Sequence, residues 1–261
     1  MLKIGFIGCG NMGGALARAA AKCKDAEVLL YDKDTEKAEK LAECIGASAV
    51  TLERVCQAKL VFLGVKPNLI ASVAGEVRDL LAVSGATVVS MAAGVSIAKL
   101  EESLSDLPII RIMPNTPAQI GCGMILYSAN TRGSGTLPLF LEAMAAAGRL
   151  DAIEERLIDA ASAISGCGPA FVYMFIEALA DGGVMCGLPR DKAMLYAAET
   201  LVGAAEMVKE TGIHPGELKD AVCSPGGSTI EGVKALEDGK LRGTVSGAVM
   251  ASYEKTLKLG K

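Results

Sequence analysis

The sequence predicts an α/β protein in two parts: a doubly wound parallel β-sheet over residues 1–151, followed by an all-helical domain over residues 152–261. Two observations support this division. In the first part, short runs of β-branched residues alternate with amphipathic segments, which is the pattern of a parallel sheet covered by helices. After Asp151 the strand-like runs stop, and helical patterns follow, separated by clusters of Gly and Pro.

Six strands are expected in the first part, at residues 3–7, 27–31, 60–65, 87–90, 109–113 and 124–128. Helices are expected between them. Over residues 35–45 an amphipathic helix is followed by Gly46, a residue that readily takes the left-handed backbone conformation after a helix. In the second part, breaks at residues 166–169, 187–189, 212–215 and 224–228 separate the predicted helices.

The composition favours a globular protein that binds a small molecule. Apolar residues make up 51% of the chain, and the net charge of −4 provides no basic surface for nucleic acid or anionic membranes. The N-terminal residues lack the apolar stretch of a signal peptide, so a cytoplasmic location is expected. The apolar segment 170–180 is interrupted by Glu177 and is too short to span a bilayer.

Cysteines and small residues add two further expectations. The eight cysteines include no Cys-x-x-Cys pair, which argues against a zinc site, and we expect thiols in a reducing compartment and no bound metal. Residues 193–208 carry small or apolar side chains around most of a predicted helix. Such helices often bury a second face against another subunit, so we expect a homodimer.

A glycine-rich motif follows the first predicted strand and opens the first predicted helix. An acidic residue, Asp32, lies 19 residues beyond the last glycine of the motif, at the end of the second predicted strand. This arrangement is the fingerprint of a Rossmann dinucleotide-binding domain, in which the helix N-terminus holds the pyrophosphate. The expected contacts are Gly8, Gly10, Asn11, Met12 and Gly13. A role of the glycines in turn geometry alone is the alternative.

Asp32 also bears on the choice between NADH and NADPH. Its carboxylate can accept hydrogen bonds from the adenosine ribose hydroxyls, whereas a 2′-phosphate there would meet like charge, so the sequence favours NADH. Lys33 and Lys37 are close enough in sequence to neutralise a phosphate if Asp32 turns away, which leaves NADPH open. The alternative for both lysines is a solvated helix start.

Six further segments resemble the pyrroline-5-carboxylate reductase family, in order and at the family's spacing. They are Val65-Lys66-Pro67, Ala92-Ala93-Gly94, the seven residues 111–117, residues 164–170, Gly187-Leu188-Pro189, and residues 214–229 with the runs HPGELKD and CSPGGST. The resemblance covers nearly the whole chain. It implies a Rossmann domain, a helical domain that forms dimers and often rings of dimers, and NAD(P)H-dependent reduction of 1-pyrroline-5-carboxylate to L-proline.

Several of these segments close parallel strands at their carboxyl ends, where open α/β sheets bind ligands. We expect them to line the nicotinamide ribose and ring through Val65, Lys66, Pro67, Ala92, Ala93, Gly94, Asn115 and Thr116. For Lys66 the alternatives are substrate contact or satisfaction of local carbonyls. For Asn115 and Thr116 the alternative to a cofactor contact is capping of the turn before Pro117.

The loop at residues 224–229 runs straight into a predicted helix and offers free backbone N–H groups to an anion. We expect the substrate carboxylate to bind there, at Ser224, Gly226, Gly227, Ser228 and Thr229. The alternative is that Ser228 or Thr229 acts only as an N-cap. In the family that the chain resembles, the threonine at the position of Thr229 hydrogen-bonds the imine nitrogen, which implies a catalytic role. His214 precedes a helix and is expected to be structural.

Other functions remain to be compared with this one. A β-hydroxyacid dehydrogenase would carry a lysine four residues past Gly168, where this chain has Val172. The chain therefore lacks the acid/base group that this function requires. A reductase of related cyclic imines stays open. A non-catalytic dinucleotide sensor would need the cofactor glycines but not the loop at residues 224–229, so turnover separates it from a reductase.

Overall fold

The computed structural model describes residues 1–259 and contains two compact units. The first comprises Met1–Cys167 with the C-terminal segment that begins at Ser252, and the second is Gly168–Ala251. The first unit therefore extends 16 residues beyond the boundary expected at residue 151. Of the domain expected over residues 152–261, Gly260 and Lys261 lie outside the described residues.

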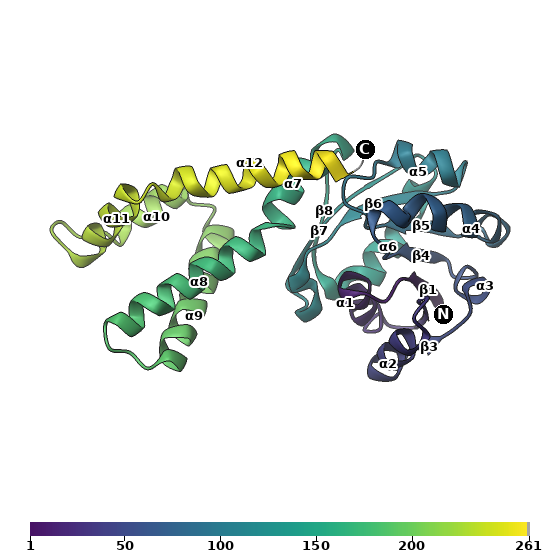
Figure 1. Ribbon diagram of the computed structural model, residues 1–261, viewed down its shortest axis with the longest axis horizontal. Coiled ribbons are helices and arrows are strands. Elements are labelled where there is room, and N and C mark those ends of the chain that lie inside the picture. The colour runs from purple at the N-terminus through teal and green to yellow at the C-terminus, as the bar shows by residue number, and fades with distance from the viewer. Residues whose placement is uncertain (260–261) are drawn as a thin grey trace. The chain divides into compact units, whose positions relative to one another are not determined.

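The first unit contains an eight-stranded sheet in the order β3-β2-β1-β4-β5-β6-β7-β8 (Figure 1). The strands are β1 Leu2–Ile7, β2 Ala26–Tyr31, β3 Ser48–Ala49, β4 Leu60–Leu63, β5 Thr87–Ser90, β6 Ile109–Met113, β7 Gly123–Ala129 and β8 Gly148–Ala152. All six expected strands are present. The edge strands β3 and β8 were not expected, because neither carries the run of β-branched residues by which the others were identified.

One strand direction differs from the predicted parallel sheet. β7 runs antiparallel to β6, while the other neighbouring pairs are parallel. The connection between β6 and β7 spans residues 114–122 and holds only the 3-10 helix η2, Thr116–Ile120. A parallel crossover needs about a dozen residues or more, usually including a helix, so this connection can only turn the chain back. The fold class is confirmed, with a sheet that is mixed at this edge.

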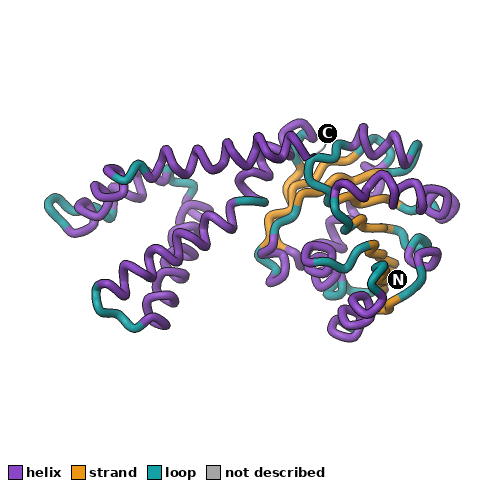
Figure 2. The backbone as a smooth tube through the Cα atoms, viewed as in Figure 1, coloured by secondary structure: helices purple, strands orange, loops and turns teal. Residues whose placement is uncertain are grey.

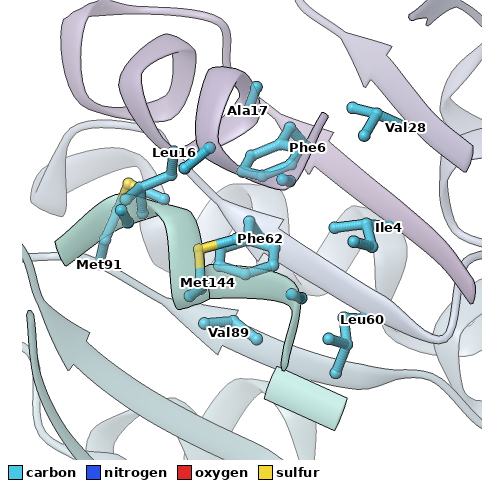
Figure 3. Packing of buried hydrophobic residues seen from close by; sticks show 14 of the residues in the cluster. Ile4, Phe6, Leu16, Ala17, Val28, Leu60, Phe62, Val89, Met91 and Met144 are labelled. Atoms are coloured by element: carbon cyan, nitrogen blue, oxygen red, sulfur yellow. The ribbon is translucent and has the colours of Figure 1, made fainter. Parts of the chain in front are cut away.

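Helices cover both faces of the sheet because its strands alternate apolar side chains with a period of two. On β1, Ile4 and Phe6 enter one core cluster and Ile7 enters the other. Figure 3 shows the first cluster, in which Phe6 stacks on Phe62 with ring centroids 4.5 Å apart. The helices packed there are α1 Asn11–Ala20, α2 Thr35–Ile45 and α6 Leu137–Met144, and those on the other face are α3 Leu52–Val55, α4 Ile70–Ser84 and α5 Ile97–Leu104.

A buried ion cluster explains why the first unit continues past residue 151. Arg111, on β6, is only 2% exposed. It donates to Glu155 of η5 (Glu155–Leu157) and to Asp159 of α7 (Ile158–Ser165). The Glu155 carboxylate also accepts the backbone N–H of Ile97 at 2.6 Å. Breaking such a buried pair leaves an uncompensated charge, so these contacts hold η5 and α7 against the sheet. The first unit also contains the 3-10 helices η1 Pro67–Leu69, η3 Gly133–Thr136 and η4 Ala145–Ala147.

The second unit is helical, as expected, and Figure 2 shows that strands occur only in the first unit among the described residues. Its helices are α8 Gly168–Met185, α9 Arg190–Thr211, α10 Pro215–Ala221, α11 Ser228–Asp238 and the greater part of α12 Leu241–Leu259. α8 and α9 pack through a seam of small residues, Ala180, Ala193 and Ala197. This is a thin core for five helices.

The apolar segment around α8 is longer than the sequence suggested. Pro169 lies in the first turn, where its missing N–H leaves no helix bond unmade, and Gly182 does not end the helix. The run Glu155–Met185 therefore meets the length and composition of a membrane-spanning helix, in contrast to the expectation for residues 170–180. The same composition suits a helix whose exposed face packs on another subunit.

Candidate cofactor and substrate sites

Three glycine backbones meet at the carboxyl ends of β1 and β4, where the order of the strands in the sheet reverses. Gly8 follows β1 with φ +101°, a conformation that side-chain-bearing residues rarely adopt. A Cβ on Gly13 would lie 2.1 Å from the Gly8 carbonyl oxygen, and one on Gly64 would lie 2.7 Å from the same atom. No side chain fits at this point. Gly64 was not among the expected residues, because it lies outside the glycine motif and only the pairing of β1 with β4 reveals its role.

Gly10 has the opposite environment. A Cβ added to it would meet nothing within 4 Å, and its φ of −70° is open to other residues. It is the N-cap of α1, and no side chain caps that helix. The first backbone N–H groups of α1 therefore have no partner within the helix and are available to an anion.

Asp32 ties this loop to the end of β2. Its carboxylate accepts the Cys9 backbone N–H at 2.7 Å on one oxygen and the Asp34 backbone N–H at 3.0 Å on the other. Burial, followed by the nearby Asp32 charge, raises the pKa of the Cys9 thiol to about 11, against a smaller lowering effect of Lys37. Cys9 therefore stays protonated at neutral pH and acts as a small packing residue.

A cleft of about 360 Å³ opens beside the loop and gathers many of the expected cofactor residues. Those that line it are Gly8, Gly10, Asp32, Lys33, Val65 and Lys66. Lys37 also lines it, as does a wall from α3, η1 and α4 that was not expected from the sequence, formed by Leu52, Leu69, Ser72, Val73 and Glu76. The spacing of the α4 members is that of one helix face, which was the available signal.

Other expected loop residues have different surroundings. Asn11 lines a neighbouring hollow of about 430 Å³ together with Arg18, Lys37 and Lys40. Met12 is half-buried and packs against the hydrophobic core. Pro67 begins η1, directly after Lys66.

The other expected nicotinamide contacts lie further along the same sheet edge, after β5 and β6, and do not line the 360 Å³ cleft. They are Ala92, Ala93, Gly94, Asn115 and Thr116. Asn115 is 8% exposed; its side-chain oxygen accepts the Met124 N–H at 2.9 Å, and its amide nitrogen donates to the Ser165 carbonyl at 2.9 Å. The side chain thus fastens the end of β6 to β7 and α7, and cofactor contact by these residues stays a prediction.

In the second unit, the loop at residues 224–229 ends in an uncapped helix. Gly227 is the N-cap of α11, and no side chain caps the helix. The Gly227 N–H donates to the Ser224 carbonyl at 3.0 Å, and Gly226 has φ +69°. Because the N-cap is Gly227, the alternative that Ser228 or Thr229 serves as N-cap is not observed. Both N–H groups are left to an anion, and Thr229 is exposed.

His214 has the structural role expected for it. It is the N-cap of α10, and its Nδ1 accepts the Gly216 backbone N–H at 3.0 Å. Within residues 1–259, no group of three or more His, Cys, Asp or Glu side chains is arranged to hold a metal ion.

The contrast between Gly10 and Gly13 predicts two separable effects. Gly10→Ala should leave thermal unfolding unchanged but weaken NADH binding by at least about tenfold, because the methyl group would occupy the space of the pyrophosphate. Gly13→Ala should lower the free energy of unfolding by about 3 kcal/mol, because its methyl group overlaps the Gly8 carbonyl. Calorimetry of binding and urea unfolding measure both. Unchanged NADH affinity in Gly10→Ala would show that no phosphate approaches this loop.

Comparisons with known families match both parts of the chain. Residues 155–259 match the pyrroline-5-carboxylate reductase dimerisation domain. Residues 3–94 match a family of NADP oxidoreductases described as coenzyme F420-dependent. The first match begins at Glu155, the residue that Arg111 holds against the sheet.

The likeness to individual proteins extends end to end. Pyrroline-5-carboxylate reductase of Escherichia coli is 40% identical over 267 residues, covering 99% of this chain and 98% of the relative, and that of Glycine max is 38% identical over 98% and 95%. The structure of a Plasmodium falciparum pyrroline carboxylate reductase with NADP bound has a TM-score of 0.88 at 34% identity, covering 100% of this chain and 98% of that one. Prephenate dehydrogenase of Aquifex aeolicus, at 14% identity and a TM-score of 0.55, shares the fold alone. Because the similarity spans both parts of the chain and both predicted sites, this chain belongs to the pyrroline-5-carboxylate reductase family.

Proposed function

We propose that this chain reduces 1-pyrroline-5-carboxylate to L-proline with hydride from a reduced nicotinamide dinucleotide. The chain is similar to these reductases from end to end. The observation that carries the proposal is that two of its helices, α1 and α11, begin without a side-chain cap. One lies beside the dinucleotide cleft, and the other lies beside a threonine hydroxyl. Each suits one anionic group of the reactants, the pyrophosphate and the carboxylate.

The residues of the first unit fit a dinucleotide. The open face of Gly10 leaves room for the pyrophosphate at the start of α1, and Asp32, which lines the cleft, is proposed to accept hydrogen bonds from a ribose. When bound, the reduced nicotinamide supplies the hydride. Val65, Lys66 and Pro67, with the residues that follow β5 and β6, are proposed to position its ring.

The residues of the second unit fit the substrate. The N–H groups of Ser228 and Thr229 are proposed to hold the carboxylate, with Gly226 and Gly227 allowing close approach. The Thr229 hydroxyl is proposed to donate to the ring nitrogen. As hydride reaches the imine carbon, that nitrogen gains electron density and takes up a proton, so the hydrogen bond strengthens in the transition state. An imine nitrogen is basic enough that positioning of the reactants can replace a strong general acid.

We further propose that NADH is preferred over NADPH. Asp32 lines the cleft and is fixed in place by two backbone N–H groups, so it cannot easily turn away from a 2′-phosphate. Lys33 and Lys37 line the same cleft and provide the opposing attraction, and the Plasmodium falciparum relative binds NADP. We expect the repulsion by Asp32 to outweigh the attraction by the two lysines, because the Cys9 N–H of the glycine-rich loop holds the Asp32 carboxylate in place.

The direct experiment follows the oxidation of NADH and of NADPH by the purified chain with 1-pyrroline-5-carboxylate, using a ketone and a hydroxyacid pair as controls. We expect the cofactor to be oxidised when the cyclic imine is supplied and not when either control compound is supplied. Binding of NADH without turnover would favour a dinucleotide sensor instead, and oxidation of the cofactor by the ketone would favour a dehydrogenase.

Replacing Asp32 should change the cofactor preference. In Asp32→Ser the ratio of kcat/KM for NADPH to that for NADH should rise by about tenfold, because the carboxylate that repels the 2′-phosphate is gone. Asp32→Asn keeps an oxygen for the Cys9 N–H and should show the same shift. An unmoved ratio in both variants would mean that Asp32 does not face the ribose.

The chain is proposed to work as a cytoplasmic homodimer, with rings of dimers as an extension. The second unit leaves large apolar side chains exposed, among them Met174, Met185 and Tyr196, beside a thin core of its own. A single chain rarely exposes so much apolar surface. Light scattering at micromolar concentration should give at least the dimer mass, and activity should fall on dilution. A stable, active monomer would contradict this.

Thr229→Val provides the sharpest test of the substrate site. It keeps the branched shape and the backbone N–H for the carboxylate and removes only the hydroxyl. We expect kcat/KM to fall by roughly ten- to a hundredfold, as for one hydrogen bond to a developing charge, with NADH affinity nearly unchanged. If the dimeric variant kept full kcat, solvent would have to protonate the product nitrogen, and Thr229 would have no catalytic role.

A further inference from the structure

The cleft of about 360 Å³ has a charged residue, Glu76 of α4, in its wall that the proposed mechanism does not use. Val73 and Glu76 of α4, with Leu69 of η1, line the cleft together with Gly10 and Asp32. Leu69 and Val73 are apolar, whereas Glu76 carries a charge. Glu76 is exposed, so its carboxylate is open to solvent and to a ligand in the cleft.

The order of groups in a dinucleotide limits what Glu76 can contact. If the pyrophosphate lies at Gly10 and the adenosine ribose at Asp32, the adenine extends beyond Asp32, toward α3 and α4. Leu52, Leu69 and Val73 offer apolar surface to the flat faces of a base. Glu76 also lines the adjoining hollow of about 540 Å³, together with Tyr31, Asp32 and Leu52. It therefore stands where the cleft meets that hollow, at the rim, where the edge of a base would lie.

The carboxylate of Glu76 is available to a ligand. Among residues 1–259 it makes no hydrogen bond and no ion pair, unlike Asp32, whose two oxygens each accept a backbone N–H. A carboxylate only accepts hydrogen bonds. It can therefore pair with the exocyclic amino group of adenine, which is a donor, and it would oppose a base with a carbonyl oxygen at that position.

We propose that Glu76 selects adenine in the cofactor by accepting a hydrogen bond from the exocyclic amino group. This inference rests on the proposed use of a nicotinamide dinucleotide and adds a residue that determines base specificity. A site built around one hydrogen bond to a donor binds an analogue without that donor more weakly, because the carboxylate then has no partner in the ligand.

The test compares NADH with reduced nicotinamide purine dinucleotide, in which a hydrogen replaces the exocyclic amino group. Dissociation constants are measured by calorimetry on the intact protein, without substrate. The wild-type chain should bind the purine analogue about tenfold more weakly than NADH, the effect of one hydrogen bond to a charged group. In Glu76→Gln the ratio of the two constants should fall, because a hydrogen bond to a neutral amide oxygen is weaker than one to a carboxylate.

Glu39→Gln is the matched control. Glu39 lines the adjoining hollow with Glu76 but does not line the cleft, so its replacement removes the same charge and should preserve the wild-type ratio. Equal affinity of the wild type for both dinucleotides would overturn the inference alone, as would a Glu76→Gln ratio that stays at the wild-type value. Failure to bind NADH, NADPH and the analogue alike would overturn the proposed function, and this inference with it.

Discussion

The contact of three glycine backbones at Gly8, Gly13 and Gly64 is the constraint on which the cofactor site depends. It brings the end of β1, the first turn of α1 and the end of β4 closer together than any Cβ allows. Two consequences follow. The N-terminus of α1 is directed at the point where the order of the strands reverses, and Gly10 is left facing open space. The anion site is thus a product of backbone packing and requires no cationic side chain.

Two acidic groups then extend this geometry in different ways. Asp32 joins the loop after β1 to the loop after β2, because its two oxygens accept one backbone N–H from each. The side chain proposed to bind the ribose therefore also holds the glycine-rich loop in place. Glu155, paired with the buried Arg111, joins the sheet to η5, which leads directly into α7, the last helix before the second unit. In both cases a charged side chain connects segments that are distant in sequence, and the position of one element depends on another.

Local signals in the sequence were sufficient for much of this account. The six main strands, the helix at residues 35–45 with Gly46 after it, the glycine motif and the uncapped helix after residue 227 each follow from neighbouring residues. What was missed depends on distant partners. Gly64 matters only because β4 pairs with β1, and the antiparallel β7 follows from a short connection. Asn115 has its partner at Ser165, 50 residues away, and sequence alone could not distinguish that contact from a cofactor contact.

The most direct measurement of the central claim is a crystal structure of this protein with NADH bound. The account predicts pyrophosphate oxygens about 3 Å from the backbone N–H groups at the start of α1, over Gly10, with a ribose hydroxyl on Asp32. Glycine packing would then be the source of the phosphate site. A pyrophosphate held instead by lysine side chains, away from the Gly8–Gly13–Gly64 contact, would contradict it.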